Sequence, residues 1–327
     1  MLISHSPNSH TDRPRISVIV PAYNVSGYLA DALTSLEHQT FQDFEVLIVD
    51  DGSTDETAAI ARSFSQRDTR FRLLQKPNGG LSSARNFGIA QAQGEYIALL
   101  DGDDAYGVDK LATHVQILDR DPQVGVVYSA SRAMREDGKQ TWMTLTGKPV
   151  QADPLMALFC KNFVGHGSNA VLRRCLFAEV GNFDETLPSV EDLDLWLRIA
   201  ALRCWRFHRD PRVLCYYRVR PSGLSYNLTQ MQKTHDRVIQ AAHLRNPAET
   251  AAILPTATAY LYRYLARLAM TTGDTQQAQQ LIQQAWQRDA RIFWQDPRSL
   301  LTLLSVKFSP LAKRVIAGSL GTASTAK

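Results

Sequence analysis

The stretch YIALLDGDDAY, residues 96–106, runs from an apolar segment directly into three carboxylates within four positions. A short apolar segment bounded by a polar turn is typical of a strand buried on both faces of a parallel sheet. Asp101, Asp103 and Asp104 would repel one another at the end of such a strand. The sequence therefore predicts that a bound divalent cation, with the phosphates it carries, balances this acidic strand end.

The same pattern of an apolar strand followed by a polar turn recurs around this stretch. Helical segments separate the apolar runs, which predicts an α/β fold with a doubly wound sheet and ligands at the carboxyl ends of its strands. Polar motifs follow the first, second and fourth strands, and we expect them to meet in one site. No G-x-G-x-x-G motif follows the first strand, which disfavours a hydride-transfer enzyme. The predicted strands are 16–21, 44–50, 71–75, 96–101 and 124–131, and the predicted helices are about 27–39, 54–64, 81–92 and 108–120.

Composition places the chain among ordinary globular proteins. It has 327 residues, of which 44% are hydrophobic and 21% charged, and its net charge of +4 is too small to indicate nucleic-acid binding. The four cysteines form no CxxC pair, so we expect buried free thiols rather than a zinc site. The polar N-terminus and the lack of a long apolar run predict a cytoplasmic protein.

Three regions are expected along the chain. Residues 1–14 read as a flexible polar tail, and regular alternation of strands and helices continues to about residue 141. After residue 226 the sequence becomes helical, and residues 259–289 read as a helical hairpin with TGD as its turn. We therefore place a domain boundary near residue 226.

Five motifs occur in a fixed order: ISVIVPAYN, VDDGSTD, NGGLSSARNFGIAQAQGEYIALLDGDD, VGNFDE and EDLDLWLR. Together they resemble a family 2 glycosyltransferase of the GT-A fold. The resemblance implies a GT-A domain over 15–225, with a donor half of about 15–130 and an acceptor half of about 131–225, followed by a helical extension over 226–327. It also implies metal-dependent inverting transfer of one sugar from a nucleoside-diphosphate sugar, with UDP the first choice of nucleotide.

The acceptor implied by the resemblance is a glycan or a lipid-linked molecule in cell-surface polysaccharide synthesis. The processive-synthase signature Q-x-x-R-W is absent, which favours single additions. Two alternatives stay open: a nucleotidyltransferase, and a nucleotide-sugar-binding protein without turnover.

Two motifs supply the candidate donor-binding residues. In similar enzymes the second Asp of DDGSTD accepts the N–H of a uracil or thymine ring, which here is Asp51 with Asp50 beside it. The alternative is an Asx-type turn and helix cap. Arg85 corresponds to a nucleotide-contacting arginine, and Lys76 is either a donor contact or an ordinary surface lysine. The base and ribose would be lined by Pro21, Ala22, Tyr23 and Asn24, unless these form a plain strand-to-helix turn.

DGDD matches the family's D-x-D motif through Asp101 and Asp103. Mn²⁺ and Mg²⁺ prefer carboxylate, water and phosphate oxygens. Asp103 is predicted as the direct ligand, and Asp101 to meet the ribose, the sugar or a metal-bound water. Gly102 would let the backbone approach the donor closely. The alternative is a solvated acidic turn that caps the next helix.

Asp192 matches the family's catalytic base, with Glu191 as its neighbour and Trp196 as a wall of the acceptor site. The alternative for Asp192 is an N-cap of the helix that runs to about residue 201. His166 is either a donor or acceptor contact or a structural residue. Arg220 stands where relatives often carry a histidine near the metal, and it is predicted to contact the diphosphate.

The segment SLLTLLSVKFSPLAKRVIAG, residues 299–318, combines leucines with Lys307, Lys313 and Arg314. One interpretation is an amphipathic helix on the inner face of an anionic membrane, where a lipid-linked acceptor would lie. The other is a helix that closes the preceding hairpin, with its basic residues in solvent.

Overall fold

The computed structural model describes residues 13–145, 153–220 and 227–308. They fall into two compact units, one from Met1–Pro149 and Phe163–Arg220, the other from Val150–Asn162 and Pro221–Lys327. The second unit thus takes in a segment upstream of the boundary predicted near residue 226. Most of the predicted tail, together with Lys313 and Arg314, lies outside the described residues.

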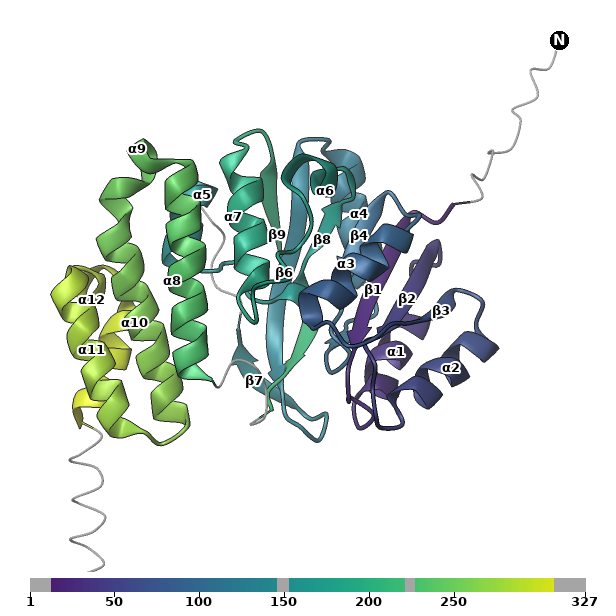
Figure 1. The fold of residues 1–327 in the computed structure, drawn as a ribbon, viewed down its shortest axis with the longest axis horizontal. Coiled ribbons are helices and arrows are strands. Elements are labelled where there is room, and N and C mark those ends of the chain that lie inside the picture. Colours follow the sequence, from purple (N-terminus) through teal and green to yellow (C-terminus); the bar gives the residue numbers. More distant parts are fainter. Residues whose placement is uncertain (1–12, 146–152, 221–226, 309–327) are drawn as a thin grey trace, which may run out of the picture. The chain divides into compact units, whose positions relative to one another are not determined.

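The first unit begins with a four-stranded parallel arrangement (Figure 1). Its strands are β1 (Ile16–Ala22), β2 (Phe44–Asp50), β3 (Phe71–Gln75) and β4 (Tyr96–Leu99), in the order β3-β2-β1-β4. Every residue of β1, β2 and β4 is buried, as their continuous apolar sequences predict. Because all four strands run parallel, the polar turns that follow them lie at the same edge of the sheet.

Three helices connect these strands, and a fourth follows β4 in the chain. They are α1 (Leu29–Glu37), α2 (Thr57–Arg67), α3 (Leu81–Gln91) and α4 (Lys110–Arg120). Each lies within a few residues of its predicted position. In α1, Leu29, Leu33 and Leu36 are fully buried, because their helical spacing places them on one face toward the sheet. Burial of each such leucine contributes roughly 1.5–3 kcal/mol.

A mixed half extends the sheet beyond β4. Within the described residues the sheet has nine strands in the order β3-β2-β1-β4-β8-β6-β9-β5, with β7 paired to β6. β8 is antiparallel to both β4 and β6, whereas β9 is parallel to β6. The sequence placed β6 only as far as residue 131 and did not locate β8 or β9. The added strands are β5 (Ala105–Tyr106), β6 (Val124–Met134), β7 (Gln140–Thr144), β8 (Val171–Arg173) and β9 (Arg206–Arg218).

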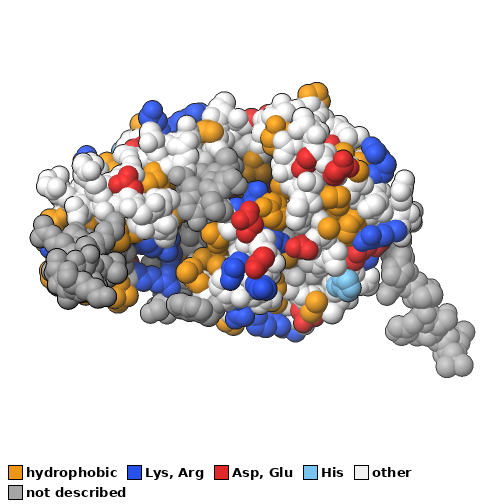
Figure 2. Space-filling view, turned by 90° about the horizontal axis from the view of Figure 1, so that it is seen from below, with side chains coloured by type: hydrophobic (Ala, Val, Ile, Leu, Met, Phe, Trp, Pro, Cys, Tyr) orange, Lys and Arg blue, Asp and Glu red, His pale blue; other side chains and the backbone are white. Residues whose placement is uncertain are grey.

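Short elements of the same unit complete the site region. A 3₁₀ turn, η1 (Gly167–Asn169), lies against β4, and α6 (Cys175–Val180) packs with α7 (Glu191–Ala201). The four cysteines are free, but Cys175 and Cys204 are exposed and only Cys215 is fully buried, which corrects the expectation of buried thiols. Figure 2 shows one face of the molecule, on which acidic and basic side chains are interspersed.

The second unit is helical. The predicted hairpin is present as α10 (Leu254–Thr271) and α11 (Thr275–Asp289), and the Asp274 side chain accepts a hydrogen bond from the N–H of Gln277 at the start of α11. Within the described residues, no helix is long and apolar enough to cross a membrane. The remaining elements are α5 (Pro154–Cys160), α8 (Leu228–Arg245), α9 (Pro247–Thr250), η3 (Ala251–Ile253), α12 (Ile292–Gln295) and a helix over 297–308.

Candidate active site

The turn after β1 is fastened to the turn after β2. The side-chain oxygen of Asn24 accepts a hydrogen bond from the backbone N–H of Thr54 at 2.8 Å. Asn24 has a left-handed φ of 50°, which asparagine tolerates better than most residues. Pro21 and Ala22 are buried, whereas Tyr23 is 49% exposed. Tyr23 therefore presents the accessible ring surface of this predicted base pocket.

Asp51 is a buried carboxylate surrounded by donors. One oxygen lies 2.6 Å from Lys76 Nζ, and the carboxylate also accepts the backbone N–H groups of Gly79 at 3.0 Å and Gly80 at 2.8 Å. Lys76 is thus not an ordinary surface lysine, because its ammonium is held against Asp51. A carboxylate offers about four acceptor positions. These three donors leave about one for a ligand.

The turn interpretation of DDGSTD accounts for two further acids. Asp50 accepts the backbone N–H of Ser53 and the amide of Gln75, each at 3.0 Å. Asp55 accepts the backbone N–H of Thr57 at 3.0 Å near the start of α2. Burial opposes ionisation of Asp55, but its hydrogen bonds prevail and lower its pKa to about 2.

Arg85 joins two segments that are far apart in the sequence. Its guanidinium lies 2.7 Å from Asp101 and 2.5 Å from Glu191, and the side chain is 1% exposed. Burial alone would lower the pKa of Arg85, but the two carboxylates outweigh it and raise that pKa above its ordinary value. Gly167 is required here, because a Cβ would lie 2.4 Å from the guanidinium. Arg85 therefore links the D-x-D motif to the first residue of α7.

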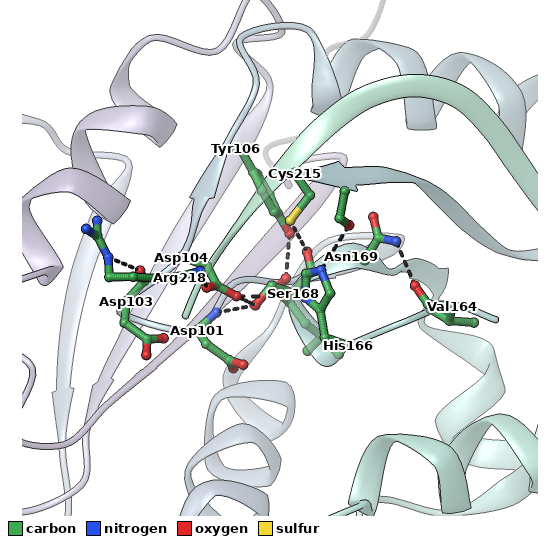
Figure 3. Close-up of polar contacts among 12 residues, drawn as sticks. Asp101, Asp103, Asp104, Tyr106, Val164, His166, Ser168, Asn169, Cys215 and Arg218 are labelled. Carbon is green, nitrogen blue, oxygen red and sulfur yellow. Dashed lines mark hydrogen bonds and ion pairs between the residues drawn. The ribbon is translucent and has the colours of Figure 1, made fainter. Parts of the chain in front are cut away.

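Asp104 is the structural acid of DGDD. Its carboxylate accepts the Ser168 hydroxyl at 2.5 Å and the backbone N–H of Arg218 at 2.8 Å (Figure 3). The Ser168 oxygen also accepts the backbone N–H of Asp101 at 3.1 Å. Burial, followed by the charges of Asp103 and Asp101, raises the pKa of Asp104 well above its ordinary value.

Asp103 lies close to Asp101 and forms an ion pair with an arginine. Its carboxylate is 2.6 Å from Arg220 and 17% exposed. Burial and the nearby charge of Asp101 raise the pKa of Asp103, although Arg220 opposes the shift. Two hard oxygen donors whose charges disfavour each other fit a divalent cation. Within the described residues no group of three or more His, Cys, Asp or Glu is placed to hold a metal ion.

Gly102 packs closely against the turn after β1. Its N–H donates to the Pro21 carbonyl at 3.2 Å, and a Cβ would lie 3.1 Å from that oxygen and from the side chain of Val25. The glycine therefore makes room for the turn after β1, and its approach to a donor stays a prediction. The interpretation of DGDD as a solvated cap is wrong, because the N-cap of α4 is Asp109 and Asp104 is 1% exposed.

His166 lies next to the acidic cluster rather than at its open side. Its Nε2 is 2.9 Å from Ser131 Oγ, its ring packs against Tyr217 with centroids 4.6 Å apart, and its Nδ1 is 3.8 Å from Asp104. Burial lowers the pKa of His166 to about 3, so the ring is neutral at pH 7. This position favours the structural interpretation.

The start of α7 carries the predicted base. Its N-cap is Val190, so Asp192 lies inside the first turn and the N-cap alternative is wrong. Val190 has a left-handed φ of 62°, a strained conformation for a β-branched residue. The Asp192 carboxylate, which is partly exposed, accepts the N–H of Leu193 at 2.7 Å. Trp196 is fully buried, so the structure corrects its predicted place as a wall of the acceptor site.

Hydrogen bonds and ion pairs join the second acidic motif to the start of α7. Arg85 connects Glu191 to Asp101, and Ser168 connects Asp101 to Asp104. Sequence reasoning did not single out Ser168 or Arg218, because the residues that they contact lie more than 60 positions away. The one signal for Arg218 was its place two residues before Arg220.

Comparisons with known proteins bear on this geometry. The chain is 35% identical over 191 residues to an uncharacterized glycosyltransferase of Rickettsia bellii, a match that covers 57% of this chain and 27% of that protein. Its matches cover 27–33% of the length of the first three curated relatives.

Solved structures show the fold. The crystal structure of S. aureus TarS 1–349 in complex with UDP-GlcNAc is similar at a TM-score of 0.56 and 19% identity, over 84% of this chain and 92% of that one. A mannosyltransferase of Pyrobaculum calidifontis, in complex with GDP-Man and Mn²⁺, is similar at a TM-score of 0.52 and 21% identity, over 91% of this chain and 88% of that one. The GT-A fold with a helical C-terminal region, expected from the sequence, is confirmed.

The family profile gives the last finding. The sequence model of the family described as glycosyl transferase family 2 matches residues 17–181. This segment contains both acidic motifs and Arg85. This match covers just over half of the 327 residues. The chain therefore belongs to glycosyl transferase family 2.

Proposed function

We propose that this chain is an inverting glycosyltransferase that moves one sugar from a nucleoside-diphosphate sugar to a hydroxyl of a glycan or lipid-linked acceptor. UDP is the first choice for the nucleotide of the donor. The reaction would serve cell-surface polysaccharide synthesis on the cytoplasmic side of the membrane. The supporting observation is the pair of carboxylates after β4, Asp101 and Asp103. They lie close enough for their charges to repel, and each forms an ion pair with an arginine.

The donor would bind across the polar turns at the carboxyl ends of β1, β2 and β4. Tyr23 offers ring surface to the base, and the remaining acceptor position of Asp51 suits one N–H of a pyrimidine ring. Asp103 and Asp101 would hold Mn²⁺ or Mg²⁺, which when bound supplies positive charge to the diphosphate. Arg220 lies 2.6 Å from Asp103, close enough for its guanidinium to turn to a diphosphate oxygen.

Asp192 would act as the general base. The acceptor oxygen forms a bond to the anomeric carbon while the bond to the diphosphate oxygen breaks on the opposite face. The acceptor proton passes to the Asp192 carboxylate, and the nucleoside diphosphate leaves with the bonding electron pair. Two contacts support this role: the hydrogen bond from the Leu193 N–H to Asp192, and the ion pair of the adjacent Glu191 with Arg85, which also pairs with Asp101.

Two conservative variants test the two roles separately. Asp103→Asn should abolish Mn²⁺-dependent UDP binding, measured by calorimetry. Asp192→Asn should leave that binding within about twofold and stop release of UDP from a UDP-sugar, because loss of a positioned base typically costs about 100- to 10,000-fold in rate. Asp137→Asn is the matched control, since Asp137 is 41% exposed and lies in a surface turn between β6 and β7.

A panel of nucleoside diphosphates in a thermal-shift assay, with and without Mn²⁺, identifies the base. UDP should give the largest Mn²⁺-dependent shift. Equal Mn²⁺-dependent binding of UDP by Asp103→Asn and wild type would contradict the assignment of Asp103 to a metal site. Normal turnover by Asp192→Asn would contradict the assignment of Asp192 as the general base.

A further inference from the structure

The second unit exposes a group of large apolar side chains, here named the aromatic patch. Its members are exposed by between 40% and 73% of their surface, although most side chains of this kind are buried. They come from α11, the end of α12 and the helix over 297–308. The patch consists of Trp286, Trp294, Leu301, Leu304 and Phe308.

Ring and cation contacts connect the parts of this patch. Trp286 meets Trp294 edge to face with ring centroids 6.3 Å apart, and it stacks on the buried Phe293 at 5.4 Å. Lys307 Nζ lies 6.0 Å from the Trp286 ring. Lys307 therefore connects the tryptophans to the helix over 297–308.

That helix has two apolar stripes. Thr302, Leu303 and Val306 are buried against the unit's own core. At roughly 100° per residue, Leu301, Leu304 and Phe308 fall on the opposite side of the helix. A helix that only closes the preceding hairpin needs one apolar stripe, so the second stripe is left for another surface.

The charges around the patch point to an anionic partner. Residues 227–308 contain nine Lys and Arg but five Asp and Glu, and after Asp296 this range has Arg298 and Lys307 and no acidic residue. The two acids nearest the patch are used internally. Asp289 accepts the Thr256 hydroxyl at 2.6 Å and pairs with Arg291, and Asp296 accepts the Ser299 hydroxyl at 2.8 Å.

We propose that the aromatic patch docks this chain on an anionic lipid surface. Tryptophan and phenylalanine suit the boundary between headgroups and acyl chains, and Lys307 and Arg298 on the same helix would meet lipid phosphates. A second copy of the chain is the weaker fit, because a symmetric contact would place like charges opposite one another. The proposal does not depend on glycosyl transfer, but it favours the lipid-linked class of acceptor.

Flotation of the full chain with vesicles tests the proposal. Binding is expected to phosphatidylcholine vesicles that contain phosphatidylglycerol, to be much weaker with phosphatidylcholine alone, and to fall as salt is raised. The double variant Trp294→Ser with Phe308→Ser should bind at least about tenfold more weakly. Lys307→Glu should weaken binding to the anionic vesicles by roughly tenfold and leave the weak binding to neutral vesicles unchanged.

Leu244→Ser is the matched control, because Leu244 is 76% exposed on α8 of the same unit but outside the patch. It should bind like wild type, and circular dichroism melts of all variants should agree because the substituted side chains are exposed. Wild-type protein that stays unbound with every vesicle overturns the proposal. So does equal binding by the double variant, or a wild-type dimer in light scattering that the double variant dissociates.

Discussion

The two acidic strand ends of the site hold their charge in different ways. After β2, Asp50 and Asp51 are held by neutral backbone N–H groups, an amide and one lysine, which leave about one acceptor position of Asp51 open. After β4, Asp101 and Asp103 face each other and are balanced by arginines. Backbone donors are fixed by the chain path, whereas a guanidinium on a long side chain can turn to another partner. The first motif is therefore held rigidly, with one acceptor position left for the donor, whereas the second is suited to exchange its arginine partner for a ligand.

Arg85→Met gives the largest expected effect on this comparison, because Arg85 is the fixed arginine of the second motif. The variant leaves the buried Glu191 and the adjacent Asp101 without their cation, which should lower the free energy of unfolding by about 3–5 kcal/mol. Urea denaturation followed by circular dichroism measures it.

Arg212→Met is the control for Arg85, since Arg212 pairs with Asp210 at 2.9 Å but is 57% exposed. Exposed pairs contribute about 0–1 kcal/mol. Equal losses in the two variants would show that the buried ion pair does not hold α7 to the sheet.

Asp51→Ala and Asp103→Asn compare how much each acidic motif contributes to the stability of the fold. Asp51→Ala leaves two backbone N–H groups and Lys76 without their acceptor, so unfolding should become easier by about 2–4 kcal/mol. Asp103→Asn removes a charge that burial and Asp101 already disfavour, so stability should stay within about 1 kcal/mol. Thermal melts of both variants check this, and the reverse order of stability would invert the two roles.

Arg220→Met tests whether the second motif exchanges partners. Without Arg220 competing for Asp103, Mn²⁺ alone should bind about tenfold more tightly, because a hydrogen bond to a charged group contributes about 1.5–3 kcal/mol. UDP in saturating Mn²⁺ should bind about tenfold more weakly, since the diphosphate loses a cation.

Calorimetry with each ligand measures the two opposite changes, and Arg220→Lys should fall between wild type and Arg220→Met. If both affinities move in the same direction, Arg220 is not the exchangeable partner of Asp103.

Asp55→Asn gives the smallest effect and concerns the first motif. The folded pKa of Asp55, about 2, is below its unfolded value of 3.8, so its stabilising contribution is present above pH 3.8 and is lost as the pH falls toward 2. Wild type should therefore lose more stability than Asp55→Asn between pH 5 and pH 2.5. The difference should be small because Asp55 is exposed. Parallel acid titrations of the two proteins would detect it.

The parallel half of the fold could be predicted because β1, β2 and β4 are short runs of mostly apolar residues that are buried on both faces. β9 could not, because exposed and buried residues alternate irregularly along its 13 residues. It is stabilised as a strand by its pairing with β6 from Val124 to Met134, which no local pattern shows.

The sequence indicated the acids of the candidate site but not most of the residues that contact them. Asp101 and Asp103 stand out because several acids directly after an apolar strand are locally unusual, whereas Asp192 was identified through the resemblance of the EDLDLWLR motif. Trp196 was misplaced because helical spacing does not show which face is inside. The packing of Gly102 could not be foreseen, because its close neighbour, the Pro21 carbonyl, is 81 residues away in the sequence.

By itself, the sequence determined the order of strands and helices in the parallel half and the residues that follow each strand. Those features depend on interactions between near neighbours along the chain. The tertiary structure decided which carboxylates are held by backbone donors and which can exchange partners. Asp51 accepts from Gly79 and Gly80, and Asp103 meets Arg220, over separations that only folding brings within hydrogen-bond distance. Hydrogen bonds and ion pairs act over a few ångströms in space, so the chemistry of each acid follows from the fold and not from its motif.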